Sequence, residues 1–338
     1  MKESSDTSGT NRFRTIYIEE AARGEPVTLD MLGRFPDVPH VYIRNYKDVF
    51  NRPRQDMRWQ ASHPGLILAL QQGPFVLPGP EVCQSFGAEA FFYSSLLLNC
   101  PFDCEYCFLQ GMYPSKYTVA FVNTGDFVRA IREEAARHAS MLLALSYDTD
   151  LPAFENIFPY VRLLSEALRD LPGLTIEFRT KSAVTSIYKE IPPSDNPVFA
   201  FSLSPREIAE RFEHGAPGTE ARLKAAEAAI AAGHRIRLCF DPVFVGEIDD
   251  RVYTDFYAEV FSRLPVDRVR DISHGFFRMN RDFFRKIAKA RPDSRLFAAD
   301  YEVSGDVLSF SQKDTSAIRE KHLTTLARYL PKEKIFIV

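Results

Sequence analysis

Cysteine is scarce in this chain, with five residues in 338, and tryptophan occurs once. No stretch of about 18 uninterrupted apolar residues exists, so the sequence predicts no membrane-spanning helix. The formal net charge is only −3, which gives the whole chain no electrostatic attraction for nucleic acid. Residues 1–15 are rich in Ser and Thr and lack the apolar run of a signal peptide, so we expect a flexible leader on a cytoplasmic protein.

The chain does contain enough apolar material for a large core. Hydrophobic residues make up 45% and aromatic residues 13% of it, and the length suits one large domain or two small ones. Because a reducing cytosol disfavours structural disulfides, clustered cysteines in such a protein indicate metal binding or catalysis.

From about residue 90 onward, short apolar runs alternate with longer amphipathic stretches, as in repeated βα units. We expect barrel strands at 91–98, 141–146, 174–179, 198–203, 234–244 and 266–274. We expect helices at 126–140 with Asp126 as N-cap, 155–170, 182–190, 219–232 ended by Gly233, 250–264 and 280–290. Two strands near 296–302 and 306–311, a helix at 314–329 and a terminal strand follow.

About six βα repeats predict an α/β fold, a partial (β/α)6 TIM-type barrel rather than a closed eightfold one. We expect a barrel domain at 91–338, with a C-terminal β-hairpin and helix as an extension. Residues 16–90, which are punctuated by Pro and Gly, are expected to form an N-terminal cap. In such a barrel, active-site residues follow the carboxyl ends of the strands.

Three of the five cysteines lie within eight positions of the segment NCPFDCEYCFLQGMYPS (99–115), in the pattern C-x3-C-x2-C. Three thiolates can hold three irons of a 4Fe–4S cluster and leave the fourth iron open to another ligand. Zinc is the main rival, but the spacing is unusual for zinc and no nearby Cys or His completes a tetrahedral set. Three thiols in a core fit poorly in a loop with Pro101 and Asp103. The expected cluster ligands are Cys100, Cys104 and Cys107.

With an aromatic residue, Tyr106, directly before its last cysteine, this motif resembles that of the radical S-adenosylmethionine (radical SAM) superfamily. The partial barrel is also that superfamily's fold. The resemblance implies that the open iron binds S-adenosylmethionine (SAM) and that the reduced cluster cleaves SAM to methionine and a 5′-deoxyadenosyl radical. It also implies an external electron donor of the flavodoxin or ferredoxin type.

Further segments resemble the spore photoproduct lyase family in order and spacing, over roughly residues 40–338. They are the cysteine segment, VAFVN (119–123), SYDTD (146–150), RTKS (179–182), FSLSP (201–205) and FEHGAPGTEARLKAAEAAIAAGH (212–234), before a strand that ends in DPVF (241–244). The resemblance implies a DNA-repair lyase. In that family, the radical abstracts hydrogen from the methylene bridge of 5-thyminyl-5,6-dihydrothymine, and two thymines are restored.

The resemblance also assigns roles to individual residues. Tyr106 would pack against the cluster near the adenine. SAM would be held by Thr149, Lys181, Ser202 and Ser204. The lysine ammonium is a compact donor that suits a carboxylate. The ordinary alternatives are a solvated lysine and hydroxyls that only cap helices.

In the family, a cysteine beside the substrate returns a hydrogen to the product radical and passes the radical on to tyrosines near the cluster. The sequence departs from the family at the residues of this relay. Tyr147 stands where the family has a substrate-facing cysteine, and Phe108 stands at one of its relay tyrosines. Three explanations are open. Tyr147 itself returns the hydrogen, although its O–H bond is stronger than a thiol's; or Cys239 points into the barrel and replaces the thiol; or the reaction is a different one. We expect Cys83, which lies ahead of the barrel, to be structural.

Three charged residues beside these segments have competing explanations. Asp148 and Asp150 can hydrogen-bond a ligand or cap a helix. Arg179 can meet a phosphate or carboxylate, or lie on the outer face of its strand.

A basic strip supports DNA binding. Arg281, Arg285 and Lys289 follow one another at i, i+4 and i+8 of a predicted helix, where they can contact phosphates. A solvated outer helix is the alternative. The segment 304–313 resembles the family's C-terminal hairpin, which places Ser309 and Phe310 against lesion-bearing DNA. We expect a monomer, and the alternative functions are a radical SAM enzyme for another nucleoside, RNA or small molecule, and a metal-binding nucleic-acid sensor.

Overall fold

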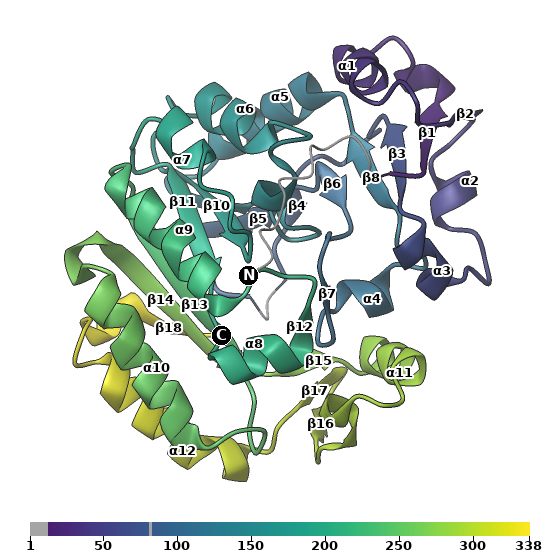
Figure 1. Cartoon of the computed structure of the whole chain (residues 1–338). Coiled ribbons are helices and arrows are strands. Elements are labelled where there is room, and N and C mark those ends of the chain that lie inside the picture. Colours follow the sequence, from purple (N-terminus) through teal and green to yellow (C-terminus); the bar gives the residue numbers. More distant parts are fainter. Residues whose placement is uncertain (1–12, 81–82) are drawn as a thin grey trace, which may run out of the picture.

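A computed structural model describes residues 13–80 and 83–338 (Figure 1). Its main sheet has eight strands in the order β18-β14-β13-β11-β10-β9-β5-β4, all parallel to their neighbours except β4. The strands are β4 (Leu77–Pro78), β5 (Ala90–Tyr93), β9 (Met141–Ala144), β10 (Leu174–Thr180), β11 (Pro197–Ser202), β13 (Ile236–Val243), β14 (Val269–Phe276) and β18 (Ile335–Ile337). The sheet curls into a half-barrel, which confirms the predicted partial barrel.

Helices cover the outer face of this sheet (Figure 1). They are α5 (Thr124–Ala135), α6 (Tyr160–Ala167), α7 (Ile187–Glu190), α9 (Thr219–Ala231), α10 (Asp250–Arg263) and α12 (Gln312–Leu326). In α9, Leu223, Ala226 and Ala229 are fully buried, and their mostly small side chains allow the helix to lie close to the strands. The chain leaves α9 through Gly233, whose φ of +97° is the left-handed conformation expected after a helix.

Local boundaries differ from the predictions where the chain turns early. The helix expected at 155–170 begins only at Tyr160, because a 3-10 turn (Leu151–Phe154) and Pro159 precede it. Asn123, not Asp126, occupies the N-cap of α5, and Asp126 lies in the first turn. The strand expected at 91–98 ends at Tyr93, and Leu97–Leu98 form a separate strand, β6.

A second sheet, ordered β2-β1-β3-β8-β6, forms the N-terminal part of the molecule. It comprises β1 (Thr15–Glu19), β2 (His40–Ile43), β3 (Gly65–Ala69), β8 (Thr118–Phe121) and β6, with helices α1 (Pro26–Arg34), α2 (Lys47–Phe50) and α3 (Met57–Ser62). Two of its strands, β6 and β8, come from beyond residue 90. The cysteine segment therefore connects two strands of the second sheet while it faces the barrel.

The chain's last third adds a small sheet, β15-β17-β16. Its strands are β15 (Arg278–Asn280), β17 (Val307–Ser309) and β16 (Glu302–Ser304). The expected strand at 296–302 is instead mainly a 3-10 turn (Arg295–Ala298). The predicted helix at 280–290 exists as α11 (Arg281–Ala290), and it packs against α4 (Leu109–Met112), directly after the cysteines. No helix in the described part of the chain is long and apolar enough to cross a membrane.

Candidate functional site

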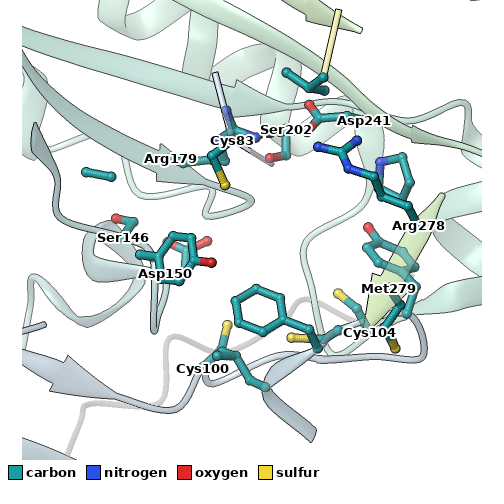
Figure 2. A pocket seen from close by; sticks show the side chains of 18 of the residues that line it. Cys83, Cys100, Cys104, Ser146, Asp150, Arg179, Ser202, Asp241, Arg278 and Met279 are labelled. Carbon is teal, nitrogen blue, oxygen red and sulfur yellow. Dashed lines mark hydrogen bonds and ion pairs between the residues drawn. The ribbon is translucent and has the colours of Figure 1, made fainter. Parts of the chain in front are cut away.

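A cavity of about 560 Å³ opens where the barrel strands end (Figure 2). Thr180, Ser202 and Asp241, from three neighbouring strands, line it, as predicted for a barrel of this type. Cys100, Cys104 and Cys107 all line the same cavity, and none forms a disulfide. The structure therefore brings the three predicted ligand thiols to the strand ends that carry the other candidate residues.

A short strand pairing holds the cysteine loop on the barrel. Residues Asp103–Cys104 (β7) pair antiparallel with Glu213–His214 (β12), which follow α8 (Arg206–Phe212). The FEHG segment therefore serves as backbone support for the middle cysteine. Beside it, the Asp103 carboxylate forms ion pairs with Lys116 and Arg291, each at 2.5 Å, which fixes the outer side of the loop.

Asn99 anchors the start of the loop. Its φ is +72°, a left-handed conformation that asparagine tolerates better than most residues. Its side-chain amide donates to the carbonyls of Ser115 and Tyr117, each at 2.7 Å. The Thr149 hydroxyl in turn donates to the Asn99 carbonyl at 2.7 Å. Thr149 lines the cavity as predicted, but its hydroxyl proton is used to hold the loop.

The Glu213 carboxylate joins the loop to the strands behind it. It accepts hydrogen bonds from the Tyr106 hydroxyl and from the Ser204 hydroxyl (3.1 Å), and it pairs with Arg222 at 2.5 Å. Both members of the ion pair are almost completely buried. Burial by itself raises the pKa of Glu213, but the charges of Arg222 and Lys181 outweigh it and lower the pKa below its usual value. Ser204 therefore supports Glu213, and it is not among the described residues that line the cavity, so its expected contact with SAM is not supported.

Lys181, one of the residues predicted to bind SAM, lies in the cavity lining. Its ammonium lies 5.3 Å from the centre of the Tyr106 ring and lines the cavity. Burial lowers the pKa of Lys181, but nearby Cys104 and Glu213 raise it overall, so the group stays charged. Its backbone N–H donates to Asp150 at 2.6 Å, which fixes the turn after β10.

The two expected aspartates act within the protein. Asp150 caps the 3-10 turn at Leu151–Phe154 by accepting from the Ala153 N–H, and it also accepts from the Thr180 hydroxyl at 2.7 Å. Asp148 accepts a hydrogen bond from Ser95 and is buried. The capping alternative therefore accounts for Asp150.

The two residues at the altered relay positions lie together. The ring centres of Tyr147 and Phe108 are 5.5 Å apart, both residues line the cavity, and Tyr93 lies 4.7 Å from Tyr147 on another side. Desolvation raises the pKa of the Tyr147 hydroxyl, with Cys83 as the next cause, so the phenol is neutral at physiological pH.

Arg179 faces the barrel interior, so its outer-face alternative is wrong. It forms ion pairs with Glu177 (3.2 Å) and Asp241 (2.9 Å). Cys239 has the same inward register on β13 as Asp241, but it is completely buried beneath these charges and is not among the described residues that line the cavity. The structure therefore gives no support to Cys239 as the replacement thiol.

Cys83 is the main correction to the sequence analysis. The sequence predicts a structural role for it, yet it lines the cavity. In Figure 2 it lies on the opposite side of the open space from Cys100 and Cys104. No periodicity or spacing in the sequence predicts this position, because it depends on contacts of Gln84 and Phe86 with the last strand of the chain.

The basic helix α11 lies beside the cysteine loop (Figure 1). Phe283 on this helix lines the cavity, while Arg285 and Lys289 are exposed and Arg281 lies 3.8 Å from Asp306. The alternative of an outer barrel helix is therefore wrong.

The two residues predicted to contact DNA from the hairpin, Ser309 and Phe310, lie in different surroundings. Phe310 is only 7% exposed, since it packs on Tyr301 and Phe277, so it is a core residue and not a DNA contact. Ser309 pairs with Arg278 of β15. Arg278 and its neighbour Met279 both line the cavity. The amino-acid sequence does not predict this wall of the cavity, because short irregular strands carry no periodic signal.

The donor set fits an iron–sulfur cluster. Three soft thiol ligands on one loop face a cavity large enough for further groups. Among the described residues, no three Cys, His, Asp or Glu side chains converge on a single metal ion. A cube takes one thiolate for each iron, so its ligands do not need to converge on one point. A partial barrel with such a loop after its first parallel strand is the arrangement of the radical SAM superfamily.

Comparison with known proteins agrees. No family model matches the chain. A spore photoproduct lyase from a Geobacillus species is 24% identical over 198 residues, a match that spans 57% of this chain and just over half (57%) of that relative. Two solved spore photoproduct lyase variants share the fold at 17% identity, each match covering 96% of this chain and 98% of the other. A cysteine-to-serine variant has a TM-score of 0.82. A double variant with bound AdoMet (SAM) and dinucleoside spore photoproduct has a TM-score of 0.81. The predicted resemblance to this radical SAM family is confirmed in sequence and in fold.

The ion pair between Glu213 and Arg222 yields a stability prediction. Arg222→Met leaves a buried carboxylate without its cation, so we expect the free energy of unfolding to fall by about 3–5 kcal/mol. Arg251→Met is the control, because Arg251 is exposed and its pair with Asp249 is worth at most about 1 kcal/mol. Urea unfolding measures both changes. Equal small losses in the two variants would contradict the role assigned to the buried pair.

Proposed function

We propose that this protein is a radical SAM enzyme that reverses a thymine dimer lesion, 5-thyminyl-5,6-dihydrothymine, in DNA. The observation that carries the proposal is the single cavity lined by three loop cysteines and by the candidate SAM-binding residues Lys181 and Ser202. The similarity to spore photoproduct lyases in sequence and fold supports the choice of reaction.

The cofactors in this proposal are a 4Fe–4S cluster and SAM. Cys100, Cys104 and Cys107 hold the cluster, and the bound cofactors supply a 5′-deoxyadenosyl radical. The Lys181 ammonium offers a positive charge to a carboxylate, and the Ser202 hydroxyl offers a hydrogen bond beside it. Thr149 acts through Asn99, since its hydroxyl positions the first cysteine.

The walls of the cavity suit a pair of thymine bases. Tyr147, Phe108 and Phe283 present aromatic rings to the open space, on which flat bases can stack. Arg278 also lines the cavity (Figure 2) and is of the type that meets a phosphate or a carbonyl oxygen. One of the solved relatives binds dinucleoside spore photoproduct, which supports a substrate of this class.

The exposed residues of α11 extend the proposal to DNA. Arg285 and Lys289 stand on the helix whose Phe283 reaches the cavity, so they lie where the strand flanking a bound lesion would pass. A lesion must leave the duplex stack to enter a cavity of this kind, and phosphate contacts outside it hold the flanking DNA.

The enzymatic proposal has a direct test. Anaerobically reconstituted protein is mixed with reductant, SAM and a synthetic spore-photoproduct dinucleotide, and thymidylyl-thymidine and 5′-deoxyadenosine are quantified. We expect both products, and we expect Cys104→Ala to lose both because one cluster ligand is missing. 5′-Deoxyadenosine without repair would keep the radical chemistry and exclude this substrate.

DNA binding is tested by its salt dependence. Removing one phosphate contact lowers the slope of log affinity against log salt by about 1, so Arg285→Ala combined with Lys289→Ala should lower it by about 2. Lys224→Ala on the outer helix α9 is the control and should leave the slope unchanged, since Lys224 is exposed away from the cavity. Fluorescence anisotropy with a lesion-bearing oligonucleotide gives the slopes. Identical slopes for all proteins would remove α11 from the interface.

A further inference from the structure

Cys83 faces the same cavity as the cluster cysteines, from the opposite wall. It is partly exposed, it lines the open space, and it is not part of the cluster motif. A substrate bound between the two walls has the cysteine loop on one side and the Cys83 thiol on the other. Of the two remaining cysteines outside the motif, only Cys83 has access to a ligand, because Cys239 is completely buried.

The position of Cys83 is fixed by contacts of the residues that follow it. The Gln84 side-chain amide donates to the Ile337 carbonyl at 2.6 Å. The Phe86 ring lies 3.3 Å from the Arg237 guanidinium and 4.9 Å from the Phe336 ring. Arg237 is itself held by the buried carboxylate of Asp271. These contacts tie the segment to two strands of the barrel, β13 and β18, so the residues directly after Cys83 are held against the strands.

Tyr147 and this thiol interact. Both residues line the cavity, Tyr147 lowers the pKa of Cys83, and Cys83 raises the pKa of Tyr147. In Figure 2 the Cys83 sulfur points into the open space that a ligand would enter. Burial raises the pKa of Cys83, even though Arg179 and Arg278 oppose this effect, so the thiol keeps its hydrogen at neutral pH.

We infer that Cys83 is the hydrogen-atom donor to the substrate radical, and that Tyr147 restores the hydrogen to Cys83. This inference rests on the proposed function and deepens it, since it names the thiol that the altered relay lacks. The relay is rebuilt from a different part of the chain. The cysteine comes from the segment before β5, and a tyrosine stands behind it.

The Cys83 S–H bond breaks and a C–H bond forms on the thymine radical left after the methylene bridge fragments, which leaves a thiyl radical. The Tyr147 O–H bond then breaks and the S–H bond reforms, which leaves a tyrosyl radical beside Phe108 and Tyr93. This step is uphill because the O–H bond is the stronger of the two, and the reduction of the tyrosyl radical draws it forward. One electron from an external low-potential donor and one proton from solvent return Tyr147 to the phenol.

The first test needs neither cluster nor turnover. Cluster-free wild-type protein is alkylated with iodoacetamide in the presence and absence of the spore-photoproduct dinucleotide, and the modified cysteines are mapped by mass spectrometry. We expect labelling of Cys83 that the dinucleotide suppresses, and no labelling of Cys239 before denaturation. Labelling of Cys83 that the dinucleotide leaves unchanged would overturn the inference, because the donor must lie against the substrate.

The second test uses the reconstituted enzyme in D₂O, where the thiol carries deuterium. Wild type should place one deuterium in each repaired dinucleotide. Cys83→Ala and Cys83→Ser should lose repair by about tenfold or more, while 5′-deoxyadenosine still forms. The serine variant keeps the size of the side chain, but its O–H bond is too strong to donate. Tyr147→Phe should keep labelled product in a single turnover and lose multiple turnovers.

The outcomes separate the inference from the proposed function. If wild type repairs the dinucleotide and Cys83→Ser repairs it equally well with the same label, the donor assignment is wrong and the lyase stands. If Cys239→Ala loses repair while both Cys83 variants repair normally, the hydrogen donor is Cys239 on β13 and the inference is wrong. If wild type forms no repaired product at all, the lyase proposal fails, and the alkylation result then decides whether Cys83 contacts the ligand.

Discussion

The buried carboxylate of Glu213 is the interaction on which the site depends. It lies between the cysteine loop and the barrel, where it accepts the Tyr106 hydroxyl from one side and Arg222 from the other. Its own backbone pairs with Cys104. A loop with three cysteines has little apolar material to fix its shape, so a buried charge with an ion-pair partner and two hydroxyl donors supplies the rigidity that packing does not. Together with Cys104, the same charge raises the pKa of Lys181.

The site also depends on the path of the cysteine segment between the two sheets. The cysteine segment leaves the second sheet at β6 and returns to it at β8, and between these strands it faces the barrel cavity. Asn99 fixes the first end through Ser115 and Tyr117, and α11 closes over α4 at the other end. The loop is thus held from both sheets and from the C-terminal extension, which explains why residues distant in sequence line one cavity.

Periodic segments and the cysteine motif were predictable, and irregular segments were not. Runs such as 174–179 and 219–232 bury one face against the core, and their spacing reveals this directly. The placement of Lys181 and Ser202 followed from their positions at strand ends. The position of Cys83 did not, because it depends on Gln84 and Phe86 finding partners at the far end of the chain. Phe310 was misjudged for a related reason, since only the folded hairpin shows that its ring is covered.

The altered relay becomes intelligible once Cys83 is seen in the cavity. Tyr147 and Phe108, which lie together in the cavity, stand where the sequence analysis expects a thiol and a tyrosine, and we infer that Cys83 from another segment serves beside Tyr147. In this inference, the hydrogen donor can come from any segment that brings a thiol into the cavity, and it does not have to lie on one particular strand. A thiol must reach the ligand, and a second donor must reach the thiol.

The central claim is that three loop thiols hold a cluster whose open iron takes SAM in this cavity. The most direct measurement is the electron paramagnetic resonance spectrum of the reduced, reconstituted protein before and after SAM is added, with iron and sulfide determined on the same sample. The account predicts four irons and four sulfides per chain and a signal whose g values shift on addition of SAM. A protein that binds a single metal ion, or a cluster signal that SAM leaves unchanged, would contradict it.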